Sequence, residues 1–137
     1  MPEPSEPLVH LVGAAFEHAF HSIDGGDTLI PFAMIEHAGQ RSLQRFVAET
    51  FEQGIANGRR LLRTSSPDRA AFAWDGFANT PEGRFDAIFI EGQDRGSPVS
   101  HIFCMRYRHA RRLLRKRTII LDNCPMLMEE DEGLISA

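Results

Sequence analysis

Four ionisable side chains in the second half of the chain could do acid–base chemistry if the fold brought them together. Asp75, Asp86 and Glu91 lie in segments with strand-like sequence, and His101 lies in the next such segment. Carboxylates and histidine are the usual groups of general acid–base catalysis. Asp86 and Glu91 are five residues apart, so on one strand they point to opposite faces and cannot form a pair by themselves. If the chain is an enzyme, we expect these four residues to line its pocket, with Trp74 beside them.

A run of basic residues offers a second kind of chemistry, the binding of anions. The stretch RYRHARRLLRKR, Arg106 to Arg117, holds seven of the 15 Lys and Arg residues in a chain of net charge −4. Clustered cations can bind phosphates. Because nucleic-acid-binding domains usually carry a basic excess overall, we interpret the run as a charged connection between two strands and do not favour nucleic acid as a partner. If an anion does bind, the residues expected to hold it are Arg108, Arg111, Arg112 and Arg115.

Histidines in the segment EHAFH, Glu17 to His21, have a spacing that could serve a metal. His18 and His21 are three apart and would share one face of a helix. A metal site needs a third or fourth ligand, and the sequence places none nearby. We therefore interpret these histidines as a polar helix face and predict neither a metal nor a cofactor. No GxGxxG, Walker, HExxH or GxSxG motif is present either.

Two helices and about five strands are predicted to position these side chains. Apolar residues from Leu8 to Ile23 recur at helical spacing after Ser5, a suitable N-cap. A second helical pattern runs from Ser42 to Leu62, and its Gly54 and Gly58 indicate close approach to another backbone. Strand-like patterns cover residues 28–36, 70–77, 84–92, 99–107 and 117–122.

The element order α-β-α-β-β-β-β is typical of the α+β class. We expect both helices to pack on one face of a mostly antiparallel, curled sheet. Pro31 cannot donate to a strand ladder, so the first strand is expected at an edge or beside a bulge. Residues 1–124 are predicted to form a single α+β domain, and residues 125–137, ending EEDEGLISA, an acidic flexible tail.

Composition narrows the class of protein. A chain of 137 residues fits one domain of ordinary size, and 42% apolar with 25% charged residues is typical of soluble globular proteins. No apolar run reaches the roughly 18 residues of a membrane span, and the acidic N-terminus does not resemble a secretory signal. We therefore expect a cytoplasmic protein with no membrane partner.

Large apolar residues are predicted on both faces of a sheet that two helices cannot fully cover. One face is therefore expected to pack against a second copy of the chain or against a partner protein. We favour a non-enzymatic binding module that acts as a homodimer. Two alternatives stay open: a small pocket-containing enzyme or ligand-binding protein of cone-shaped α+β architecture that uses the Asp, Glu and His side chains, and an adaptor that holds a partner segment.

Overall fold

The computed structural model describes residues 3–24, 26–112, 115–121, 126–130 and 133–136, with the backbone alone described for 110–112, 115–117, 119 and 126–130. The elements along the chain are α1 (Glu6–Ile23), β1 (Phe32–His37), β2 (Gln40–Arg45), α2 (Phe51–Arg63), β3 (Arg69–Thr80), β4 (Gly83–Asp94), β5 (Ser100–Arg112), β6 (Arg115–Ile120) and β7 (Met126–Glu130). The predicted order is confirmed. The short strands β2 and β7 are additional to it.

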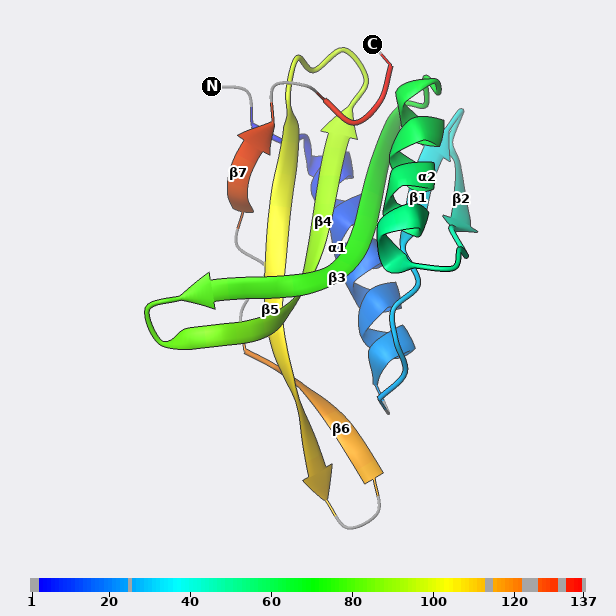
Figure 1. The fold of residues 1–137 in the computed structure, drawn as a ribbon. Coiled ribbons are helices and arrows are strands. Elements are labelled where there is room, and N and C mark those ends of the chain that lie inside the picture. The colour runs from blue at the N-terminus through cyan, green and yellow to red at the C-terminus, as the bar shows by residue number, and fades with distance from the viewer. Residues whose placement is uncertain (1–2, 25, 113–114, 122–125, 131–132, 137) are drawn as a thin grey trace.

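The strands form one antiparallel sheet that is not closed into a barrel, so the α+β class is confirmed. The strand order is β2-β1-β3-β4-β5-β6, and β7 also pairs with β5. Strands β3 and β4 pair along their whole length, from Arg69 opposite Asp94 to Thr80 opposite Gly83. The far ends of the β3–β4 and β5–β6 hairpins project from the body of the molecule (Figure 1).

The two helices lie on opposite faces of the sheet, so the prediction that they share one face is wrong. Ala71 and Ala73 of β3 belong to the buried cluster that contains α1. Ala70 and Phe72, their neighbours, belong to a second cluster with Leu62 of α2. Neighbouring residues of a strand point to opposite faces, and Figure 1 shows α1 behind the sheet and α2 in front. The reason is that β3 is buried on both faces over this stretch, so each face needs a cover.

Helix α1 begins where the sequence predicts. The Ser5 side chain accepts a hydrogen bond from the Leu8 amide and so caps the helix. Ser5 also donates, through its own amide and hydroxyl, to the carboxylate of Asp94 at the end of β4. The start of the helix is therefore attached directly to the sheet.

The second helix is shorter than predicted because its first part is strand β2. Ala38 and Gly39 both have positive φ, 50° and 79°, which is the geometry of a two-residue hairpin turn. This turn sends the chain back along β1, so β1 lies between β2 and β3 and is not the edge strand that Pro31 suggests. Pro31 lies just before β1, where no amide donor is needed.

The glycines of α2 permit the close approach that the sequence indicates. A Cβ on Gly54 would lie 2.6 Å from the backbone oxygen of Phe46, and one on Gly58 would lie 2.4 Å from the ring of Phe72. Both distances are far below van der Waals contact. Without side chains at these positions, α2 packs directly onto the sheet.

The C-terminal segment is part of the domain, contrary to the predicted flexible tail and the boundary at residue 124. Strand β7 pairs with β5, and Leu134 and Ile135 are buried in the cluster beneath α2. Their amides donate to the side-chain oxygen of Gln93 on β4. Two apolar residues after an acidic stretch therefore complete the core.

Candidate functional site

The four predicted acid–base residues do not meet in one place. Asp75 and Asp86 share the α1 face of the sheet, since their cross-strand partners Ile88 and Tyr107 belong to the α1 cluster. His101 is on this face too, but it lies six residues before Tyr107 along β5, roughly 20 Å away. Glu91 lies on the opposite face. A single pocket that contains all four residues is therefore excluded.

Asp75 is held by a tyrosine. The Tyr107 hydroxyl lies 2.9 Å from each carboxylate oxygen of Asp75, and Tyr107 is buried. Burial raises the pKa of Asp75, the hydrogen bond from Tyr107 opposes this, and the neighbouring charge of Asp86 raises the pKa further. Burial and Asp75 together raise the pKa of Tyr107. The hydroxyl therefore stays protonated as a donor, which makes the pair a buried link between β3 and β5.

Glu91 forms a buried ion pair with the second helix. It is 2% exposed, and its carboxylate accepts from Arg59 of α2 at 2.7 Å and from the Ser100 hydroxyl. In the sheet Glu91 lies opposite Ile102, whereas Arg106 lies opposite Ala87. Arg59 comes from a separate element, and its position beside Gly58 is the sequence signal that could have found it, because Gly58 marks where α2 touches the sheet.

The Arg59 guanidinium covers aromatic rings on the same face. Its central carbon lies 5.0 Å from the centre of the Trp74 ring and 5.6 Å from that of Phe72, within the range of a cation–π contact. Trp74 is in turn stacked on Phe89 of β4, with ring centres 5.7 Å apart and planes 15° apart. Neither Trp74 nor Phe89 is fully buried.

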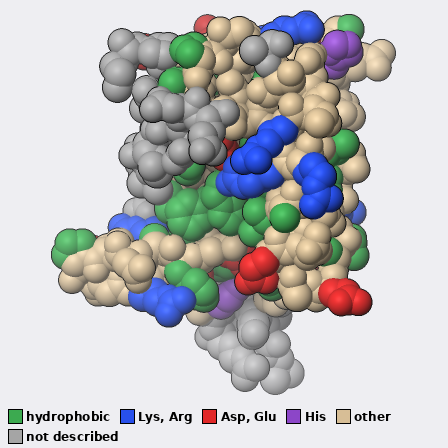
Figure 2. Space-filling view, turned by 45° about the horizontal axis from the view of Figure 1, so that its top comes forward, with side chains coloured by type: hydrophobic (Ala, Val, Ile, Leu, Met, Phe, Trp, Pro, Cys, Tyr) green, Lys and Arg blue, Asp and Glu red, His purple; other side chains and the backbone are tan. Residues whose placement is uncertain are grey.

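A second arginine and a third ring extend this surface. Arg106 of β5 lies over the Phe85 ring at 4.8 Å, and register places both on the same face as Phe89. We call the five residues Arg59, Trp74, Phe85, Phe89 and Arg106 the aromatic–arginine strip. Figure 2 shows this side of the molecule, where hydrophobic side chains gather beside positively charged ones above the projecting hairpin.

The strip is held in place by backbone packing as well as by the ion pair. A Cβ on Gly76 of β3 would lie 3.1 Å from the Phe89 ring, so the absence of a side chain there lets the ring lie against β3. Buried Glu91 holds Arg59 from below. The rings and the guanidinium groups are therefore preorganised at a partly exposed surface, which is the condition for binding without a large ordering cost.

The basic run is not a connection between two strands, so that prediction is wrong, and most of its residues belong to the strands themselves. Residues 106–112 belong to β5 and residues 115–117 to β6, paired from Ala110 opposite Arg117 to Arg112 opposite Arg115. Arg108 is exposed. The side chains of Arg111, Arg112 and Arg115 lie outside the described part of the structure. The backbone shows that the run is a two-stranded ribbon continuous with β5.

His18 and His21 of α1 lie in different environments. The His18 ring packs edge-on against Phe32, with ring centres 4.8 Å apart, and its buried Nε2 has no hydrogen-bond partner. Burial lowers the pKa of His18, helped by the nearby charges of Arg45 and His21. His21 is exposed. Within the described residues, no three His, Cys, Asp or Glu side chains are arranged to hold a metal ion.

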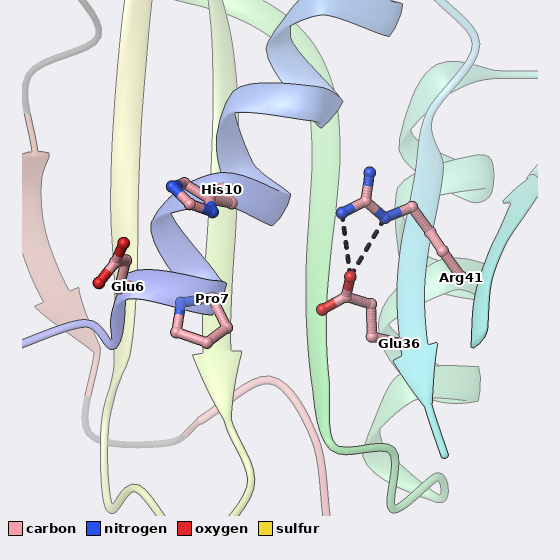
Figure 3. Close-up of a pocket in the computed structure, with 5 residues that line it drawn as sticks. All are labelled: Glu6, Pro7, His10, Glu36 and Arg41. Carbon is pink, nitrogen blue, oxygen red and sulfur yellow. Dashed lines mark hydrogen bonds and ion pairs between the residues drawn. The ribbon is translucent and has the colours of Figure 1, made fainter. Parts of the chain in front are cut away.

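A pocket of about 280 Å³ lies beside the start of α1, lined by Glu6, Pro7, His10, Glu36 and Arg41 (Figure 3). Its ion pairs serve the fold: Arg41 and Arg69 both donate to Glu36, at 2.9 and 3.0 Å. Burial pulls the pKa of Glu36 upward, but the two arginines outweigh it and the pKa is lowered. Glu36 and Arg41, which face each other in this pocket, are thus already paired, and we regard the strip as the stronger candidate for a functional site.

No family model, curated protein or solved structure matches the chain. Among the described helices, none is both long enough and apolar enough to cross a membrane.

Proposed function

We propose that this chain is a non-enzymatic binding module whose contact surface is the aromatic–arginine strip. The single observation that carries the proposal is the stacked, partly exposed pair Trp74 and Phe89. The Arg59 guanidinium lies over Trp74 and is held there by its ion pair with buried Glu91. Aromatic and arginine side chains are the residues that dominate binding energy at interfaces. The alternative of an acid–base enzyme has less support, because its expected residues lie on two faces of the sheet.

The chain contains a single tryptophan, and it lies in the strip. Trp74 fluorescence therefore reports on this surface without a label. We would titrate the protein with three probes: a single-stranded RNA oligonucleotide, an acidic peptide rich in Glu and Tyr, and a heparin oligosaccharide. The expected result is a saturable change in Trp74 emission with at least one of them.

Two phenylalanine substitutions test whether the strip is the surface used. Phe89→Leu removes a ring from the strip, while Phe77→Leu makes the same change on the other face of the sheet, where Phe77 is 55% exposed. Binding that is weakened in Phe89→Leu and kept in Phe77→Leu supports the proposal. No response to any probe, or equal binding by both variants, overturns it.

The same proposal includes a homodimer through strand β2. This strand ends the sheet, and all six of its residues, QRSLQR, are exposed. Two copies paired antiparallel with Ser42 opposite Ser42 would place each Arg41 opposite a Leu43 and each Gln40 opposite a Gln44, so no like charges would face each other. Val47 and Phe51, 76% and 49% exposed, follow β2 directly and add apolar area.

Sedimentation equilibrium tests the dimer. We expect a mass of twice 15.4 kDa, and a monomer for Leu43→Lys, because a lysine on an edge strand opposes pairing. Val9→Lys changes another exposed apolar residue on α1 and should remain a dimer. A monomeric wild-type protein at high micromolar concentration would refute the dimer and leave the strip untouched.

A further inference from the structure

We infer that the ligand of the aromatic–arginine strip is single-stranded nucleic acid, an inference that rests on the binding role proposed above. The first reason is the shape of the strip. Trp74 and Phe89 offer a rigid, partly exposed aromatic stack. Unpaired bases stack on such rings whatever their sequence, because every base has a π-face. The Arg59 guanidinium lies over the Trp74 ring at 5.0 Å, and this planar group also stacks on bases.

The second reason is the distribution of charge next to the strip. From Arg106 the strand β5 runs directly into the basic hairpin, and the run to Arg117 holds seven cations and no acidic residue. The rest of the chain carries eight basic and 19 acidic residues. A polyanion would therefore be attracted to this surface and repelled by most others. The net negative charge of the chain directs binding to the hairpin and does not exclude it.

The third reason is the position of Arg106 and Arg108 on β5. Arg106 lies opposite Ala87 and so faces the same side of the sheet as Phe89, and Arg108, two residues further along, is exposed. The ion pair of Arg106 with Glu82 is weak, because the two groups lie 3.6 Å apart and Glu82 is 74% exposed.

The geometry favours a single strand over a duplex. In a duplex the base faces are covered by stacking, and a side-chain platform reaches only the edges and the phosphates. The strip presents planar groups, namely the partly exposed Phe89 ring and the Arg59 guanidinium that covers Trp74. The distance from Arg106 to Arg112 along β5, roughly 20 Å, gives an extended strand a continuous track. Bases would lie on Phe89 and on the Arg59 guanidinium, and phosphates along β5 from Arg106.

The test measures Trp74 emission and affinity together. The intact chain is titrated at several salt concentrations with oligouridylate of about twelve nucleotides, with inorganic polyphosphate and with duplex DNA. We expect oligouridylate to quench Trp74 and to bind at least about tenfold more tightly than polyphosphate, which has charge and no bases.

Two variants separate stacking from charge. Phe89→Leu should lower the affinity for oligouridylate at least about fivefold and leave its salt dependence unchanged, because one stacked base is lost. A double change of Arg108 and Arg112 to Ala, two positions on the same face of β5 as Arg106, should lower the slope of log K against log salt by about 1.4, at about 0.7 for each phosphate contact. Its matched control changes two exposed arginines elsewhere, Arg45 and Arg60, and should bind like the wild-type protein.

Each remaining outcome overturns the inference. Equal binding of polyphosphate and oligouridylate, without a change in Trp74 emission, would make the hairpin a general anion-binding site. Tighter binding of duplex DNA would make the ribbon a groove-binding element. A response to the acidic peptide or heparin but not to oligouridylate would leave the proposed binding module standing with another ligand, whereas silence from every probe would remove both.

Discussion

The buried ion pair between Arg59 and Glu91 leads to a prediction in which a second substitution restores part of the stability lost through the first. Arg59→Met keeps an unbranched side chain over the rings of Phe72 and Trp74 but removes the guanidinium from a carboxylate that is 2% exposed. Only the Ser100 hydroxyl then remains of the two donors at Glu91. A buried charge that loses its partner costs about 3–5 kcal/mol. This is a large part of the roughly 5–15 kcal/mol that holds a domain together.

Adding Glu91→Gln to Arg59→Met should restore part of that loss. The second change removes the unpaired charge, and a neutral amide can still accept from Ser100 at a cost of about 1 kcal/mol for the hydrogen bond lost. We therefore expect the double variant to be about 2 kcal/mol more stable than Arg59→Met alone.

Urea unfolding followed by Trp74 emission measures both free energies of unfolding, provided that the slope with urea is unchanged. The control is Arg45→Met, which removes an exposed arginine of β2 and should change the free energy of unfolding by less than about 0.5 kcal/mol. If Arg59→Met behaves like this control, or if the double variant is the least stable of the set, the ion pair does not hold α2 in the way described.

Three further predictions concern the fold around the strip. Gly58→Ala should destabilise the protein by about 1–3 kcal/mol, because its Cβ would meet the buried ring of Phe72 at 2.4 Å. A Cβ at Gly13 of α1 would meet no atom within 4 Å, so Gly13→Ala should stabilise the protein by up to about 1 kcal/mol. Thermal unfolding compares the two variants, and a change in stability of the same sign in both would contradict the packing of Gly58 against Phe72. Leu134→Ala should lower the free energy of unfolding in urea by about 2–5 kcal/mol, since Leu134 is 1% exposed. An unchanged free energy of unfolding would contradict the burial of Leu134 and favour a flexible tail. Because burial raises the pKa of Asp75 above its usual 3.8, its ionised form opposes folding, and stability from this residue increases as the pH falls through the raised pKa. Asp75→Asn should therefore stabilise the protein at pH 7, and this gain should disappear in acid; a gain that is independent of pH would refute the cause.

Much of the fold could be predicted from the hydrophobic pattern of the sequence. The predictions were wrong where a strand has no apolar face, as in β2, or has two, as in β3. Helix α1 and the strands β3 to β5 have clear periods, and they were predicted near their observed places. Strand β2 has no apolar alternation, because every residue of QRSLQR is exposed. Its position is set by the Ala38–Gly39 turn. The side of the sheet that each helix covers could not be predicted either, since β3 is apolar on both faces.

The candidate site was predictable only in part. The sequence identifies Trp74 and Phe89 as large residues that two helices cannot cover, and it shows the basic run. It cannot show that Arg59 reaches Glu91, because the two residues lie 32 positions apart on elements whose packing depends on the whole fold. The strand register is equally hidden from the sequence: Glu91 lies opposite Ile102, and Arg106 lies opposite Ala87. A shift of a few residues in register decides which charges meet.

The attachment of Ser5 to Asp94 has a consequence for synthesis on the ribosome. The two residues are 89 positions apart, so α1 is made long before the carboxylate that holds its first turn. The buried face of α1 is covered later still, because Phe103 and Met105 of β5, which belong to the same cluster, are translated after Asp94. The emerging chain therefore carries an amphipathic helix with no cover until most of the domain has been translated. During this interval the nascent protein is open to chaperones and to premature association with other chains.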